Sequence, residues 1–145
     1  MENDNCLFCG IVEERIPAYK IYEDERHVAV LDIYPAVRGQ SLILPKKHFG
    51  SYVFEMQEDD YIALMVASRN VAKLTDKKLG SLRTCMVMEG MEVDHAHIKL
   101  YPIYEVLTNI ASGTVDLNKY PGYLSTKHGE RMADSELERL LARFK

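Results

Sequence analysis

The stretch Glu89–Pro102, Glu-Gly-Met-Glu-Val-Asp-His-Ala-His-Ile-Lys-Leu-Tyr-Pro, decides how this chain is expected to fold. Apolar and polar residues alternate along it, as in a β-strand whose successive side chains point to opposite faces. We therefore expect a strand over residues 93–101, with a packing face formed by Ala96, Ile98 and Leu100. The opposite face, which is available for chemistry, would carry His95, His97, Lys99 and Tyr101.

Two histidines at this spacing also have an ordinary structural explanation, as polar residues on the solvent side of an antiparallel strand. Gly90 before the strand and Pro102 at its end mark a bounded segment. Two cysteines near the N-terminus, Cys6 and Cys9, and a further histidine, His48, would converge with these histidines only if this face of the strand is a site. Their presence favours a functional site on the polar face of the strand.

The composition predicts one globular domain over residues 1–145, because 47% of the 145 residues are apolar and 28% are charged. With 22 acidic against 18 basic side chains the net charge is -4, so nucleic acid is not an expected partner. No stretch approaches a membrane span, and the acidic segment 1–5 resembles neither a signal nor a transit peptide. Three cysteines do not make a disulfide framework, so we expect a cytoplasmic protein.

The remaining pattern predicts an α+β fold with about five antiparallel strands arranged as a meander. The expected strands cover residues 19–23, 27–33, 40–44, 81–88 and 93–101. The last two would form a hairpin across a tight turn at Glu89 and Gly90.

Two helices are expected to accompany the sheet. A long amphipathic helix covers residues 58–78, with Gly80 as its left-handed C-terminal cap. The last helix begins at Ser135, whose side chain would form a capping box with Glu138. Residues 104–123, the first part of a C-terminal arm and helix over 103–145, show no clear pattern and are expected to be irregular.

The pair Cys6 and Cys9 together with His48 and His95 forms the donor set of a tetrahedral Cys₂His₂ zinc site. Their long separation in sequence differs from that of a zinc finger, and plain thiol-rich packing is the alternative. A redox Cys-x-x-Cys is disfavoured, because that motif normally opens a helix after a strand. His95 and His97 would lie about 6 to 7 Å apart along the strand, so chelation of one ion by both is a further alternative.

Several of these motifs occur in the order and spacing of the histidine-triad (HIT) superfamily, which the chain resembles from Cys6 to about Pro102. The opening motifs are Cys6-Leu7-Phe8-Cys9, Ile16-Pro17 and Tyr22-Glu23-Asp24. The middle motifs are Leu31-Asp32-Ile33, Pro35, Gly39 and Leu44-Pro45-Lys46-Lys47-His48. The signature is Gly90 through Val93 with His95 and His97. The resemblance implies a HIT-like fold, with an antiparallel sheet and a long helix, and a homodimer with one continuous sheet.

The resemblance also implies an activity, the hydrolysis or transfer of a nucleotidyl group through a covalent intermediate on His97. The substrate would be a purine nucleotide conjugate, such as a nucleoside phosphoramidate, a dinucleoside polyphosphate or a related ester. Asp32 matches the acid that binds the ribose hydroxyls. An apolar base slot, whose residues could equally be plain core, would consist of Phe8, Ile16, Val30 and Ile33. The structural zinc ligands implied by the match are Cys6, Cys9, His48 and His95.

The chain departs from the family pattern on the phosphate side of the expected site, beside Gly90. Lys99 replaces the third signature histidine, Gln40 replaces a histidine after the loop glycine, and Met91-Glu92 replaces Gln-Ser. Lys99 still offers a cation to phosphate. Glu92 would repel polyphosphate unless it turns outward, pairs with Lys99 or meets a less anionic substrate.

These departures define an alternative function, a zinc-stabilised nucleotide-binding protein with little or no turnover. Loss of the third histidine alone does not decide between the two functions, because the uridylyltransferase branch also lacks it and is active. The C-terminal arm offers further candidates for the site, although the sequence does not establish that they reach it: Tyr104, Tyr120, Tyr123, His128 and Arg131.

Overall fold

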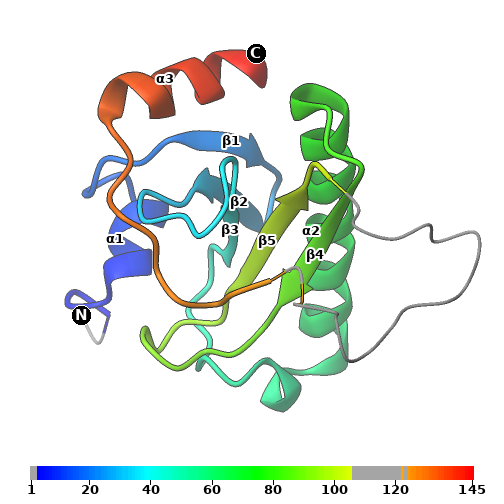
Figure 1. Ribbon diagram of the computed structural model, residues 1–145. Coiled ribbons are helices and arrows are strands. Elements are labelled where there is room, and N and C mark those ends of the chain that lie inside the picture. The colour runs from blue at the N-terminus through cyan, green and yellow to red at the C-terminus, as the bar shows by residue number, and fades with distance from the viewer. Residues whose placement is uncertain (1–2, 106–121, 123) are drawn as a thin grey trace, which may run out of the picture.

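The centre of the molecule is a five-stranded antiparallel sheet with the strand order β1-β2-β3-β5-β4 (Figure 1). The computed structural model describes residues 3–105, 122 and 124–145. The strands are β1 (Lys20–Glu23), β2 (His27–Leu31), β3 (Ser41–Pro45), β4 (Arg83–Val87) and β5 (Ile98–Ile103). The expected α+β fold is confirmed, although β5 returns between β3 and β4 instead of following a simple meander.

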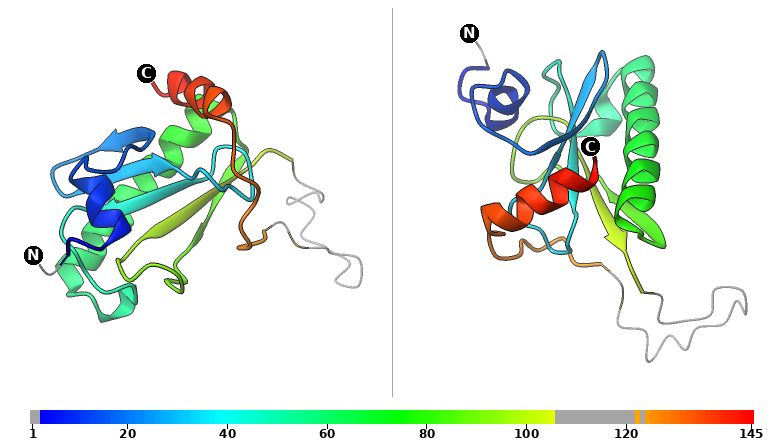
Figure 2. Two further views of the ribbon diagram at one scale, coloured as in Figure 1. Left: turned by 90° about the vertical axis from the view of Figure 1, so that its left-hand side faces the viewer. Right: turned by 90° about the horizontal axis from the view of Figure 1, so that it is seen from above.

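The helices lie on both sides of this sheet. The long helix α2 (Glu58–Leu79) covers one face, and the short helix α1 (Leu7–Val12) lies on the other (Figure 2). Helix α3 (Asp134–Arg143) lies beside the C-terminal end of α2, where Arg143 donates a hydrogen bond to the carbonyl of Lys78 at 2.9 Å. A 3₁₀ turn, η1 (Val53–Glu55), precedes α2. Among the described residues, no helix is both long and apolar enough to cross a membrane.

Alternation along the strands separates two apolar clusters. Ala96, Ile98 and Leu100 join the main core between the sheet and α2, as the sequence pattern predicts. A smaller cluster on the opposite face contains Phe8 of α1 with Val28, Val30 and Leu44. Because this second cluster depends on Phe8, it packs α1 against the sheet face that also carries His97 and Lys99.

The strand expected over residues 93–101 begins later and ends later. β5 starts at Ile98, because the preceding backbone bonds elsewhere: the Ala96 N–H donates to the Phe49 carbonyl at 2.9 Å. Pro102 lies inside β5, opposite Thr84, and does not close it. The pairing of β5 with β3 ends at Leu100, so the missing N–H of Pro102 removes no bond from that ladder.

The connection from β4 to β5 also differs from the expected tight hairpin, because residues 88–97 separate the two paired strands. The long helix ends as predicted, with Gly80 in the left-handed conformation (φ 73°). The capping box at Ser135 is wrong. Helix α3 starts at Asp134, with Ala133 as its N-cap and no side-chain cap, so Ser135 lies within the first turn.

Candidate active site and metal centre

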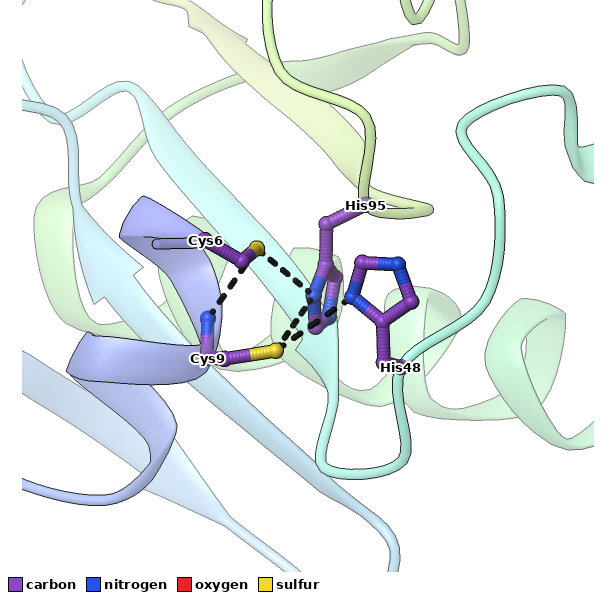
Figure 3. A group of neighbouring side chains, drawn as sticks. All are labelled: Cys6, Cys9, His48 and His95. Carbon is purple, nitrogen blue, oxygen red and sulfur yellow. Dashed lines mark hydrogen bonds between the residues drawn. The ribbon is translucent and has the colours of Figure 1, made fainter. Parts of the chain in front are cut away.

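The four residues expected to bind a metal converge at one point (Figure 3). Cys6 caps the start of α1 and Cys9 lies in its first turn, while His48 follows β3 and His95 precedes β5. One donor atom from each residue lies within 4.8 Å of the others. Segments far apart in sequence therefore form a Cys₂His₂ metal-binding cluster.

The orientation of the rings fits a metal-ligand role. Nδ1 of His48 lies 3.3 Å from the Cys9 sulfur, and Nδ1 of His95 lies 3.5 Å from both sulfurs. His95 Nε2 lies 2.9 Å from the Pro45 carbonyl and donates to it, so the unprotonated Nδ1 faces the sulfurs. Burial lowers the pKa of His95 to about 4, which keeps the imidazole neutral as a ligand must be.

Burial also raises the pKa of the Cys9 thiol to about 11. A bound cation would reverse this effect, because it favours the thiolate. Two alternatives from the sequence fit less well. No strand precedes α1 within the described residues, unlike the redox motif, and His97 is not among the four clustered groups.

A cavity of about 220 Å³ lies next to this cluster, between α1, the end of β2 and the segment that leads into β5. Most of the nucleotide-site residues expected from the sequence line it: Phe8, Ile16, Val30, Asp32, Ile33, Glu92, His97 and Lys99. The remaining apolar lining, which was not predicted from the sequence, includes Leu7, Ile11, Pro17, Ala18, Leu31, Leu42 and Val93.

His97 is buried beside the cavity in a defined orientation. Its Nδ1 lies 2.7 Å from the His95 carbonyl, to which it donates, so Nε2 is left without a proton. The edge of the Phe8 ring packs against the imidazole, with the centroids 5.0 Å apart. Burial, and secondarily the charge of Lys99, lowers the pKa of His97. A neutral imidazole with a free nitrogen lone pair is the form that attacks phosphorus.

Asp32 is fixed at the end of β2 by two donors. One carboxylate oxygen accepts from the Tyr34 N–H and the other from the Gln40 amide, both at 2.8 Å. The Gln40 carbonyl oxygen accepts from the Ala36 N–H at 2.7 Å. Gln40 therefore lies behind Asp32 and does not line the cavity. Gly90 does not line it either.

The two unusual charges of the site each have a partner. Lys99 is buried and pairs with Glu89 at 2.5 Å, and Glu92 pairs with His128 at 2.5 Å. The hydrogen bond from His128 lowers the pKa of Glu92. Glu92 thus does not pair with Lys99, whose partner Glu89 was not predicted from the sequence. Its position ten residues before Lys99 gives no signal of this contact, which depends on the path of residues 88–97.

Of the C-terminal residues expected near the site, only His128 lines the cavity among those that the structure describes. Tyr104 donates to the Arg38 carbonyl at 2.8 Å, and Arg131 pairs with Asp134 at 2.9 Å. Tyr120 and Tyr123 lie outside the described residues.

Relatives with known sequences match about two thirds of this chain. An uncharacterized HIT-like protein of Mycobacterium tuberculosis is 51% identical over 103 residues, which cover 67% of this chain and 70% of the relative. An adenosine 5′-monophosphoramidase of Saccharomyces cerevisiae is 32% identical over 103 residues, which cover 67% of this chain and 61% of the yeast protein.

Solved structures share the fold over nearly the whole chain. A hypothetical histidine triad nucleotide-binding protein from Sulfolobus tokodaii has a TM-score of 0.75 at 26% identity, covering 96% of this chain and 89% of that one. A zinc-bound histidine triad family protein from Mycobacterium smegmatis has a TM-score of 0.70 at 23% identity, covering 97% and 93%. The family model described as HIT domain matches residues 13–106. The chain therefore belongs to the histidine-triad (HIT) family.

Proposed function

We propose that the protein is a HIT hydrolase or nucleotidyl transferase that forms a covalent nucleotidyl intermediate on His97. The observation that carries this proposal is the orientation of the His97 ring, whose Nδ1 donates to the His95 carbonyl at 2.7 Å. The unprotonated Nε2 is thereby available to the cavity that His97 lines with Lys99 and Asp32. Attack on the α-phosphorus would split one displacement into two easier steps.

The residues around His97 would bind and orient a purine nucleotide conjugate. Phe8, Ile16 and Val30 offer apolar surface for the base, and Asp32 offers carboxylate oxygens for the ribose hydroxyls. Lys99 supplies a cation for the phosphate oxygens, which stabilises charge that develops during phosphoryl transfer. The cavity and the activity named for the yeast relative support a nucleoside phosphoramidate, a dinucleoside polyphosphate or a related ester as substrate.

A second function, nucleotide binding with little or no turnover, has one observation in its favour. Lys99 takes the place of the third signature histidine and is held by Glu89. A cation committed to an internal carboxylate has less to offer a transition state than a free one.

Trapping of the intermediate distinguishes the two functions. Protein incubated with adenosine 5′-phosphoramidate or a diadenosine polyphosphate is quenched in denaturant and analysed by peptide mass spectrometry. The enzyme carries an AMP adduct on the peptide that contains His97, and His97→Ala carries none. His27→Gln is a matched control, because His27 is buried on β2, pairs with Asp24 and does not line the cavity. Nucleotide binding without any adduct would support the second function.

We further propose that the metal is zinc and that its role is structural. The two thiolates and two imidazoles are the donor set that zinc prefers, and the relative from M. smegmatis is zinc-bound. Bound zinc would cross-link α1 to the segments around His48 and His95. A reducing cytoplasm, the location that the sequence predicts, would keep both cysteines available. Elemental analysis of protein purified without added metal should find about one zinc per chain, and a folded protein without metal would refute this assignment.

Two copies of the chain are proposed to form a homodimer. β4 is an edge strand, and apolar side chains are exposed on it and on the adjacent α2. Edge strands are surfaces on which sheets extend.

A further inference from the structure

The segment that leads into α3 is fixed against the loop that follows β2 (Figure 1). The Gly129 N–H donates to the Tyr34 carbonyl at 3.2 Å, and the Met132 N–H donates to the Ile33 carbonyl at 2.8 Å. A β-carbon at Gly129 would lie only 1.9 Å from the Pro35 carbonyl oxygen. Only glycine permits this approach, so the attachment of the segment to the loop depends on Gly129 itself.

This attachment places His128 at the cavity that contains His97. The His128 ring meets the Tyr34 ring edge-on, with the centroids 6.3 Å apart, and its Nε2 lies 2.5 Å from a carboxylate oxygen of Glu92. The side chain is 45% exposed, so the ring borders both the cavity and the solvent. A histidine from the C-terminal segment thus faces the same space as the proposed nucleophile.

The proposed reaction needs a proton donor, because an amine or alkoxide leaves phosphorus poorly without one. Lys99 is held by Glu89, and an ammonium group releases its proton too reluctantly at neutral pH to be an efficient general acid. Both carboxylate oxygens of Asp32 already accept hydrogen bonds, from the Tyr34 N–H and the Gln40 amide, so Asp32 is arranged as an acceptor. His128 is the remaining imidazole among the described residues that line the cavity.

We propose that His128 is a catalytic residue, the general acid and base that protonates the leaving group; this rests on the proposed function. In the first step a bond forms between His97 Nε2 and the α-phosphorus, the bond from phosphorus to the leaving atom breaks, and the His128 imidazolium protonates that atom. In the second step a water oxygen bonds to phosphorus and the phosphorus–nitrogen bond breaks. Its electron pair returns to His97, and a water proton returns to His128.

The charges around His128 suit a group that changes protonation near neutral pH. The hydrogen bond that His128 donates to Glu92 raises the pKa of His128 above its ordinary value, and the negative charge of Asp32 adds to this effect. Burial and the positive charge of Lys99 act in the opposite direction. The protonated form, which a general acid requires, is therefore more populated at pH 7 than for a free histidine.

Two substrates that differ in their leaving group test this role. Adenosine 5′-phosphoramidate needs a proton on its departing nitrogen, whereas the p-nitrophenyl ester of AMP releases a stable phenolate without one. His128→Gln keeps a hydrogen-bond donor for Glu92 but cannot transfer a proton. We expect it to lower the single-turnover rate of adduct formation from the phosphoramidate by about 100-fold and to change that rate for the nitrophenyl ester by less than about threefold.

Three results would overturn or redirect the proposal. Equal losses in the rate of adduct formation for both substrates would show that His128 only positions the substrate, and no loss for either would exclude a role as acid. If the wild-type protein turned over neither substrate and formed no adduct on His97, the proposed function itself would fail. Arg131→Gln is the matched control, because Arg131 lies on the same segment but pairs with Asp134 away from the cavity.

The pH profile provides a readout that a purely structural role would not move. With the phosphoramidate, the wild-type rate should fall as pH rises through the pKa of His128. Glu92→Gln removes the partner that raises this pKa, so the fall should occur at lower pH; NMR titration of the His128 ring should show the same downward shift. An unchanged profile in Glu92→Gln would contradict the assignment.

Discussion

Asp32 illustrates how a single buried polar residue is held in place for a ligand. Gln40 donates to one of its carboxylate oxygens at 2.8 Å and accepts from the Ala36 N–H. Gln40→Ala removes both bonds and leaves buried groups without partners, so we expect the free energy of unfolding to fall by about 1–3 kcal/mol. AMP binding should weaken as well, because Asp32 loses its fixed orientation. Urea unfolding and calorimetric titration measure the two effects.

The control for this change is Gln57→Ala. Gln57 is exposed at the start of α2, and its side chain makes no capping hydrogen bond. We expect both quantities to stay unchanged in that variant. An equal loss in the two variants would contradict the role assigned to Gln40.

Two glycines with positive φ differ in the space that surrounds them. Gly80 has φ 73° and no atom within 4 Å of an added β-carbon, whereas Gly90 has φ 64° and would place that carbon 2.6 Å from the Ser51 carbonyl oxygen. Gly80→Ala should therefore cost only backbone strain, about 1 kcal/mol. Gly90→Ala adds a clash with backbone and should cost about 3 kcal/mol. Comparable midpoints in urea would show that the loop yields to the clash.

The residues of the site differ in how far the sequence could predict them. The Cys-x-x-Cys pair and the histidines could be grouped because few residue types bind zinc and all four fell in a recognisable order. The ion-pair partners of Lys99 and Glu92 could not be predicted from the sequence. Each charged side chain had several possible partners. Glu92 pairs with His128 because the backbone is attached at Gly129, and no local sequence pattern predicts that attachment.

Helix α1 is the element that the proposed zinc cross-link would stabilise most. It has six residues, too few for a stable isolated helix, yet it carries Phe8 into the cavity. Removal of zinc with a chelator should free its N-terminal end, because Cys6 and Cys9 then lose the metal that joins them to His48 and His95. Hydrogen exchange should accelerate over residues 6–12 but not over α2.

Nucleotide affinity should fall with the loss of α1. We expect AMP to bind about tenfold more weakly after chelation, because the apolar contact with Phe8 is lost. Cys6→Ser should reproduce the effect, whereas Cys85→Ser should not, because Cys85 lies on β4 outside the metal cluster. Unchanged exchange over α1 after complete removal of metal would mean that packing of Phe8 alone holds the helix.

The periodicity of the sequence predicted which helices and strands exist better than it predicted the residues at which they begin and end. The α2 stripe, its acidic start and Gly80 all indicate the same helix, and the structure has it. β5 was harder, because its extended pattern continues back through His95 although the backbone there bonds to Phe49. Pro102 was wrongly expected to end the strand. A proline interrupts a strand only where the sheet requires a hydrogen bond from the backbone N–H that proline lacks.

The order of the strands is a property of the whole molecule, and local patterns do not contain it. Sequential pairing was correct for β1 with β2, β2 with β3 and β4 with β5. The insertion of β5 beside β3 joins the two halves of the sheet. That pairing brings the segment with His95 and His97 next to α1 and so creates both the metal cluster and the cavity.

The proposed dimer predicts which substitutions on the surface should change the mass of the protein in solution. Exposed apolar side chains follow the β4 edge and the outer face of α2: Leu82 (61%), Met86 (46%), Ile62 (49%) and Val66 (51%). Ile62 and Val66 are four residues apart and share one face of the helix. Sedimentation equilibrium should give twice the chain mass for the wild-type protein. Val66→Lys should shift the equilibrium towards monomer, because it buries a charge in an apolar interface. Met91→Lys, a change at an 84% exposed position in the segment between β4 and β5, should remain dimeric. A monomeric wild-type protein, or equal effects of the two substitutions, would place the interface elsewhere or exclude it.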